Sequence, residues 1–162
     1  MQALRGHADS VNEVAWLPYS NTVASASSDK TVSLWDARTG LATATFFGHA
    51  NSVNTVCASL DGRTLVSGDA DGVLKVWDVR GVAGRGGGAV AAHAVNRVRL
   101  DAAAAVAVAA CDDGKVHGRR MEGFEASGGL SGHEDAVQSV AIDPAGRSVV
   151  TGASDCTFRV WA

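Results

Sequence analysis

The sequence predicts an all-β fold built from about four copies of one unit, each an antiparallel sheet of four strands. Two observations support this prediction. Several residue types recur at a fixed step of 42 residues, and each copy contains short stretches rich in β-branched residues, separated by turn residues. Four antiparallel strands in about 40 to 45 residues make one blade of a β-propeller. We therefore expect about four blades in an incomplete, open propeller arc.

Four series of residues carry the repeat. A turn aspartate recurs at Asp29, Asp71, Asp113 and Asp155. An amide side chain recurs at Asn12, Asn54, Asn96 and Gln138. A tryptophan recurs at Trp35, Trp77 and Trp161, with Arg119 in its vacant slot. Gly-His pairs end at His7, His49 and His133. Four series in one register exclude chance similarity, so the chain consists of repeats.

Each repeat presents its strands in the same order. The first strands are SVNEVAW, SVNTVCA, VNRVRL and AVQSVAI, and the second include TVASAS, TLVSGD and SVVTGAS. A tight turn leads to the third strands TVSLWD, VLKVWD and TFRVW, and ATATFF is a fourth. The predicted blades cover residues 6–47, 48–91, 92–131 and 132–162. The outer strand of the last blade is missing or supplied from elsewhere.

Two stretches invite other interpretations. AAAAVAVAA would be a helix by propensity, but its register with NTVASAS favours a strand. GVAGRGGGAV, residues 81–90, resembles a phosphate-binding loop, yet it lacks Gly-Lys-Ser/Thr and no helix pattern follows it. We expect a loosened outer strand with a flexible loop there, with nucleotide binding as the alternative.

Composition excludes several classes of protein. The chain has 162 residues, a net charge of −3 and no basic run, so a nucleic-acid partner is not expected. The longest apolar run, Ala102 to Cys111, is about half of what a membrane span needs. Residues after Met1 form no signal-peptide core. Cys57, Cys111 and Cys156 are predicted to be reduced, buried thiols in a cytosolic compartment.

These markers together resemble the WD40 family: Gly-His, an aspartate in a tight turn, and a tryptophan about 28 residues after the histidine. The resemblance implies a hydrogen-bonded chain of tryptophan, hydroxyl, histidine and aspartate within each blade. By position, blade one would use Trp35, Ser25, His7 and Asp29. Blade two would use Trp77, Ser67, His49 and Asp71, and blade four Trp161, Thr151, His133 and Asp155. We call such a chain a tetrad.

Ser, His and Asp in one network also suggest a nucleophilic hydrolase. Three identical sets, each behind a tryptophan, would be three inaccessible nucleophiles, and no Gly-x-Ser-x-Gly turn exposes a serine. The sequence therefore favours structural tetrads, and no catalytic residue, metal site or cofactor is expected.

Blade three departs from the pattern. Arg119 replaces the tryptophan, Ala109 replaces the hydroxyl residue, and His93 lies two residues out of register. Losing several members together leaves few buried partners unsatisfied. We predict a degenerate blade in which Arg119 pairs with Asp113 or faces solvent or a partner, and in which His117 is exposed and passive.

A closed WD40 propeller usually has seven blades, so four leave two sheet faces uncovered. Either residues 1–5 close a four-bladed ring, or the chain is part of a longer protein, or another polypeptide supplies the remaining blades. The wedge angle of WD40 blades disfavours the first option.

The amide series lies near the narrow face of the propeller, where WD40 proteins commonly contact ligands. The residues just before the turn aspartates are Ser28, Ala70, Asp112 and Ser154. We expect partner contacts from both series and from Arg119 and Arg120, or, for the amides, hydrogen bonds between blades.

A closer resemblance to one family runs in order along the chain, and its most specific segments are SDKTVSLWDARTG and GHEDAVQ. These runs resemble the carboxyl-terminal repeats of the axonemal central-apparatus family of sperm-associated antigen sixteen. The resemblance implies a non-enzymatic scaffold in the axoneme of motile cilia and flagella, with central-pair projection and bridge proteins as partners near microtubules. The rival is a soluble cytoplasmic adaptor, such as the substrate-recognition part of a ubiquitin ligase or a signalling scaffold.

Overall fold

The computed structural model describes residues 3–162, and every regular element in that range is a β-strand. Blade one contains β1 (Val11–Trp16), β2 (Thr22–Ser27), β3 (Thr31–Asp36) and β4 (Ala42–Phe47). Blade two contains β5 (Val53–Ala58), β6 (Thr64–Asp69), β7 (Val73–Asp78) and β8 (Ala83–Ala89). Blade three contains β9 (Val95–Leu100), β10 (Val106–Cys111), β11 (Lys115–Arg120) and β12 (Ala126–Ser131), and blade four β13 (Val137–Ile142), β14 (Val149–Ala153) and β15 (Phe158–Trp161).

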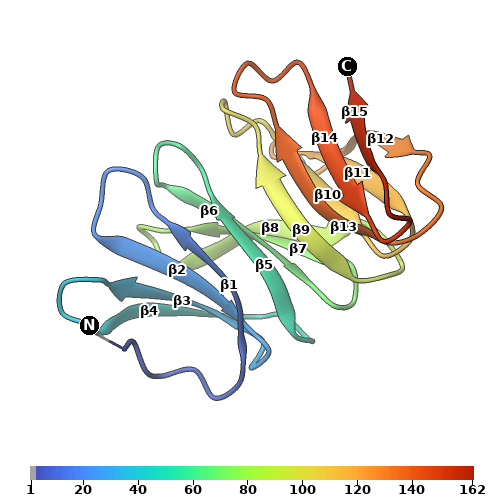
Figure 1. Ribbon diagram of the computed structural model, residues 1–162. Helices are drawn as coiled ribbons and strands as arrows, with labels where there is room; N and C mark the ends of the chain where they lie inside the picture. Colours follow the sequence, from blue (N-terminus) through green and yellow to red (C-terminus); the bar gives the residue numbers. More distant parts are fainter. Residues whose placement is uncertain (1–2) are drawn as a thin grey trace.

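The strands of each blade pair in sequence order and antiparallel, which gives three four-stranded sheets and one three-stranded sheet. Figure 1 shows the sheets following one another in an arc, with the two termini at its opposite ends. The first strands, β1, β5, β9 and β13, pack against one another along the inner side of the arc. The predicted all-β, open propeller arc is therefore confirmed, and the described residues do not close a four-bladed ring. Met1 and Gln2, which belong to the segment considered above as closing such a ring, lie outside the described residues.

The hydrophobic core lies between neighbouring blades. Leu17 and Phe46 of blade one pack with Leu65 and Trp77 of blade two, and all four are at most 4% exposed. Two further clusters fill the spaces between blades two and three and between blades three and four. Burying one Val, Leu or Phe side chain stabilises a fold by about 1.5–3 kcal/mol. Blade-to-blade packing therefore holds the arc together.

The glycine-rich run supplies the outer strand predicted for blade two. Residues Ala83–Ala89 form β8, which pairs with β7 over six residues with a register shift between Val76 and Trp77. Gly87 has φ +143°, and a Cβ there would lie 2.3 Å from the Leu74 carbonyl oxygen. Glycine is thus required at Gly87 for the close approach of the two strands. Because β8 has almost no side chains, a hollow of about 960 Å³ opens between it and blade three, lined in part by Arg120, Met121 and Phe124.

The alanine-rich run forms β10, as its register predicts. Ala107, Ala109 and Ala110 are completely buried, so the inter-blade packing of small side chains overrides helix propensity. All three cysteines are free; Cys57 and Cys111 are buried, but Cys156 is exposed, contrary to the prediction that all are buried. Within residues 3–162, no helix is long and apolar enough to cross a membrane.

Candidate functional site

Blade one holds a complete tetrad. The Trp35 indole N–H donates to Ser25 Oγ at 2.7 Å, and Ser25 Oγ lies 2.6 Å from His7 Nε2. His7 Nδ1 lies 2.7 Å from Asp29 Oδ2. Thr31 adds a hydroxyl donor to Asp29, which fixes the carboxylate in its turn. The tetrad thus links the second and third strands of blade one to the segment before its first strand.

Blade two builds its tetrad with a different aspartate from the one predicted. Trp77, Ser67 and His49 repeat the first two links at 2.8 and 2.6 Å, but His49 Nδ1 meets Asp69 Oδ2 at 2.7 Å. Asp71, which keeps the 42-residue step, is exposed and accepts a hydrogen bond from the Asn51 amide. The prediction of Asp71 was wrong because β6 ends on a buried aspartate. In blade one, Ser27 occupies that position and is too short to reach the histidine.

Blade four repeats the pattern of blade one with threonine in place of serine. His133 lies 2.8 Å from both Asp155 and Thr151, and the Trp161 N–H donates to Thr151 Oγ1 at 2.9 Å. Thr157 donates to Asp155 as Thr31 does to Asp29.

The tryptophan indole N–H donates to the hydroxyl, and the two nitrogens of the histidine meet that hydroxyl and the aspartate carboxylate. Burial lowers the pKa of His49 and outweighs the opposite effect of the Asp69 carboxylate. The lowered pKa favours the neutral ring. Burial disfavours the ionised form of Asp29, but hydrogen bonds from Thr31, His7 and backbone N–H groups outweigh it and lower its pKa. Among the described residues, no buried side-chain polar atom lacks a partner.

The Ser-His-Asp order matches that of a hydrolase triad, but the environment does not. Ser25, Ser67 and Thr151 are each at most 3% exposed, and each hydroxyl already receives an indole N–H. A hydroxyl that is nearly buried and already engaged by an indole and an imidazole is not an exposed nucleophile, although Ser25 and His7 also line a hollow on the open face of blade one. The tetrads are structural links.

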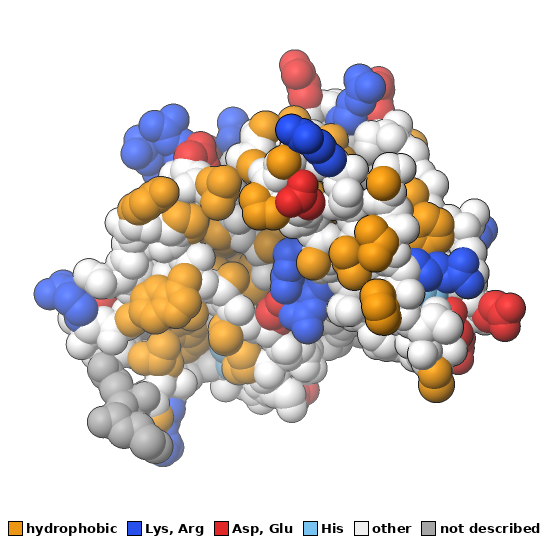
Figure 2. Space-filling view, turned by 45° about the horizontal axis from the view of Figure 1, so that its top comes forward, with side chains coloured by type: hydrophobic (Ala, Val, Ile, Leu, Met, Phe, Trp, Pro, Cys, Tyr) orange, Lys and Arg blue, Asp and Glu red, His pale blue; other side chains and the backbone are white. Residues whose placement is uncertain are grey.

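The open face of blade one shows what a neighbouring blade normally covers. A hollow of about 560 Å³ lies beside its tetrad, lined by residues that include Leu4, Val14, Val23 and Trp35. In blade two the corresponding tryptophan, Trp77, is covered by Phe46 of blade one, with ring centroids 5.3 Å apart. Figure 2 shows hydrophobic side chains gathered near the amino-terminal end of this face.

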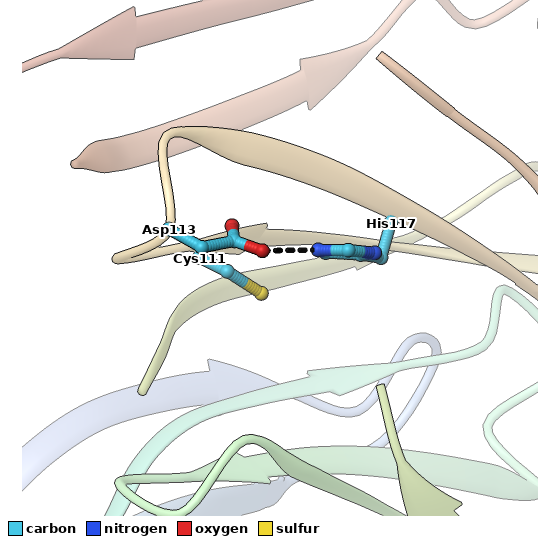
Figure 3. A group of neighbouring side chains, drawn as sticks. All are labelled: Cys111, Asp113 and His117. Carbon is cyan, nitrogen blue, oxygen red and sulfur yellow. Dashed lines mark hydrogen bonds and ion pairs between the residues drawn. The ribbon is translucent and has the colours of Figure 1, made fainter. Parts of the chain in front are cut away.

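Blade three lacks the tetrad and makes other contacts. Arg119 does not pair with Asp113; its guanidinium donates to the carbonyl oxygens of Val90 and Gly118. His117 is not passive either, since its Nε2 lies 2.8 Å from Asp113 Oδ2 and its side chain is only 21% exposed. Figure 3 shows the His117 ring pointing at the Asp113 carboxylate, with the sulfur of Cys111 beside it. This group, which sequence reasoning missed, lies where the blade departs most from the repeat.

The amide series forms hydrogen bonds between blades. The side chains of Asn12, Asn54 and Asn96 donate to the backbone carbonyls of Val53, Val95 and Val137, the first residue of the next inner strand, at 2.9–3.1 Å. Gln138, at the end of the arc, donates to Ser154 Oγ within its own blade. Three of the four amides are thus used inside the arc. We use the term rim for the exposed Asp112, Gln138 and Ser154 at the blade-four end of this series.

Sequence reasoning also missed an ionic group on the inner strands. The carboxylate of Glu13 on β1 accepts hydrogen bonds from the Thr55 hydroxyl and the Val56 N–H on β5, and pairs with Arg97 and Arg99 on β9. The Glu13 side chain is 8% exposed and each arginine 36%. Glu13, Thr55 and Arg97 occupy the same position of successive repeats, which is the signal that could have revealed the group.

Comparisons with known proteins agree with the repeats. The family model for the WD domain, G-beta repeat, matches residues 1–36, 40–78 and 125–162, and most of blade three falls between the matches. The chain is 56% identical over 41 residues to THO complex subunit 3 from Arabidopsis thaliana, a match that covers 25% of this chain and 13% of that protein. It is 44% identical over 45 residues to the WD repeat-containing protein 89 homolog from Dictyostelium discoideum, 28% of this chain and 12% of that protein. The chain thus matches only about an eighth of the length of either relative. Since the family model covers well over half of the residues, this chain belongs to the WD40-repeat family.

Proposed function

We propose that this protein is a non-catalytic scaffold whose propeller arc holds other proteins in place. The observation that carries the proposal is the use of all three Ser/Thr-His-Asp sets as buried links closed by tryptophan. WD40 repeats generally serve protein–protein interaction, which agrees with this proposal.

The rim is the partner-contact surface that this proposal favours. Its members are exposed and combine a carboxylate, an amide and a hydroxyl, a polar and adaptable set. Asn12, Asn54 and Asn96 position the inner strands, and their amides are already engaged. Arg120 is exposed beside the hollow between blades two and three and is a second contact candidate, whereas Arg119 is held by two backbone carbonyls.

Further blades, from the same or another polypeptide, are proposed to cover the two end faces. Val11 on β1 is the positional equivalent of Val53, Val95 and Val137, whose carbonyls each receive an amide from the preceding blade. At the other end, Gln138 occupies the donor position. Val14 and Trp16 are 62% and 63% exposed on blade one, and Phe158 and Val160 are 74% and 62% exposed on blade four. Exposed apolar side chains at both ends suit the blade-to-blade packing seen inside the arc.

For the finer role, we propose a structural component of the central apparatus of motile cilia and flagella, located in the axoneme. The support is the resemblance of SDKTVSLWDARTG and GHEDAVQ to that axonemal family. One relative is by name a subunit of a complex, which agrees with a scaffold in general and not with cilia in particular.

Detergent extraction of ciliated cells that express the tagged chain tests this role. We expect the chain to stay with the microtubule core and Asp112→Lys on the rim to release it. Tyr19→Asn, a change in the exposed β1–β2 loop, is the matched control and should leave retention unchanged. Recovery of the unmodified chain wholly in the soluble fraction would refute the axonemal location and favour a soluble adaptor.

Ser25→Ala separates the scaffold from the hydrolase alternative. The change removes the partner of Trp35 and His7, so we expect a loss of about 1–3 kcal/mol in the free energy of unfolding. No hydrolytic activity toward ester or peptide substrates should be present to lose. An esterase activity that disappears in Ser25→Ala while the fold remains intact would contradict the scaffold proposal.

A further inference from the structure

Blade three brings together three side chains of the kinds that hold transition metals. Cys111 at the end of β10, Asp113 in the turn and His117 on β11 offer a sulfur, a carboxylate oxygen and an imidazole nitrogen. The three ligand atoms all lie within 4.8 Å of one another, as Figure 3 illustrates. We propose that this group is a binding site for a divalent transition metal, with Zn²⁺ as the best-suited ion.

The donor set supports this choice of metal. Zn²⁺ takes Cys sulfur, His nitrogen and carboxylate oxygen in tetrahedral sites, with metal–ligand distances of about 2.0–2.3 Å. Ligand atoms of such a tetrahedron lie about 3.5 Å apart. The group therefore reaches metal geometry by small side-chain rotations that separate His117 Nε2 from Asp113 Oδ2, now 2.8 Å apart. Mg²⁺ and Ca²⁺ prefer oxygen ligands and fit this set less well.

The other blades show that the group is particular to blade three. Serine, aspartate and alanine occupy the Cys111 position in the other blades: Ser27, Asp69 and Ala153. Serine, lysine and arginine occupy the His117 position: Ser33, Lys75 and Arg159. The repeat thus requires neither ligand. In blade three the residue in the hydroxyl position is Ala109, which lies opposite His117 across β10 and β11 and has no hydroxyl to hydrogen-bond the His117 ring.

Access and charge also suit a cation. The side chains of Asp113 and His117 are 18% and 21% exposed, which leaves a path for the ion and a fourth position for water or another ligand. Cys111 is completely buried and provides the inner ligand. The carboxylates of Asp112 and Asp113 make the local potential negative, while Arg119 opposes them in part. Binding would replace the hydrogen bond between His117 and Asp113 and would release the thiol proton of Cys111.

Metal binding by the whole chain, after treatment with a chelator, tests the proposal. Co²⁺ serves as a spectroscopic probe and Zn²⁺ as its competitor. We expect one Co²⁺ per chain, a thiolate-to-metal absorption band, tetrahedral d–d bands, and displacement by Zn²⁺. Cys111→Ser should abolish the thiolate band and weaken binding by more than about 100-fold, because even changes in outer-shell partners reduce metal affinity about 10–100-fold.

Two further variants keep the test decisive. His117→Gln retains a hydrogen-bond donor toward Asp113 but is a poor ligand, so it should fold and lose the metal. Cys156→Ser removes an exposed thiol that lies elsewhere, on blade four, and should bind Co²⁺ like the unmodified chain. The proposal fails if the unmodified chain shows no thiolate band, or if His117→Gln binds as tightly as the unmodified chain. It also fails if the band disappears in Cys156→Ser and persists in Cys111→Ser.

Discussion

Blades two and three share the same strand order but hold their strands together differently. Blade two links Trp77, Ser67, His49 and Asp69 in a buried polar chain. Blade three has no such chain; Arg119 turns to backbone carbonyls, and a histidine from the third strand meets the turn aspartate. Both blades nevertheless form four-stranded sheets of similar length. The strand order and the packing between blades therefore define a blade, and the tetrad adds to its stability.

The comparison also shows that a tetrad is lost as a unit. A buried hydroxyl or indole without a partner costs about 1–3 kcal/mol, so removing one member leaves a penalty on the others. In blade three the indole and the hydroxyl are both replaced, and the remaining aspartate has found another histidine. The buried side-chain nitrogen and oxygen atoms of blade three consequently all have hydrogen-bond partners.

The largest expected difference concerns the tryptophan slot. Trp77→Ala should lower the free energy of unfolding by about 3–5 kcal/mol, because it empties a buried site and removes one of the two hydrogen-bond partners of Ser67. Arg119→Ala, the same slot in blade three, should cost less than about 1 kcal/mol. Urea denaturation of both variants measures the difference. Equal losses would mean that Arg119 stabilises blade three as strongly as the indole stabilises blade two.

A smaller difference separates the two aspartates of blade two. Asp69→Ala removes the partner of His49 and should cost about 1–3 kcal/mol. Asp71→Ala removes only an exposed contact to Asn51 and should leave the urea midpoint nearly unchanged. If Asp71→Ala were the more damaging change, the 42-residue register would have identified the correct aspartate.

The smallest expected effect is a pH dependence that comes from blade two. Burial lowers the pKa of His49, so below about pH 6.5 the unfolded chain takes up a proton that the folded chain does not. Stability should therefore fall as the pH decreases from 7.5 to 5.5. His49→Gln should be less stable at pH 7.5 but should lose less stability over this range, as measured by urea denaturation at both pH values. An equal loss in both proteins would exclude His49 as the source.

Much of this architecture could be predicted from the sequence, because a repeat constrains every copy at once. The register of AAAAVAVAA correctly outweighed its helix propensity, since its alanines fill narrow space between blades. The same reliance on register failed at Asp71, where a neighbouring buried aspartate was better placed. His117 was also misjudged, because its partner Asp113 follows from the three-dimensional arrangement and not from a family pattern. The outer strand β8 was predicted from its place in the repeat despite the low strand propensity of glycine, and its lack of side chains allows close strand contact.

The carboxylate of Glu13 has a consequence for how such a chain can change over generations. It joins three successive repeats through unlike side chains at one repeat position: glutamate, threonine and arginine. Exchanging the first of these repeats for another copy would remove the carboxylate from Arg97 and Arg99. Repeats that look interchangeable in their tryptophans are thus distinguished by their charges at this position.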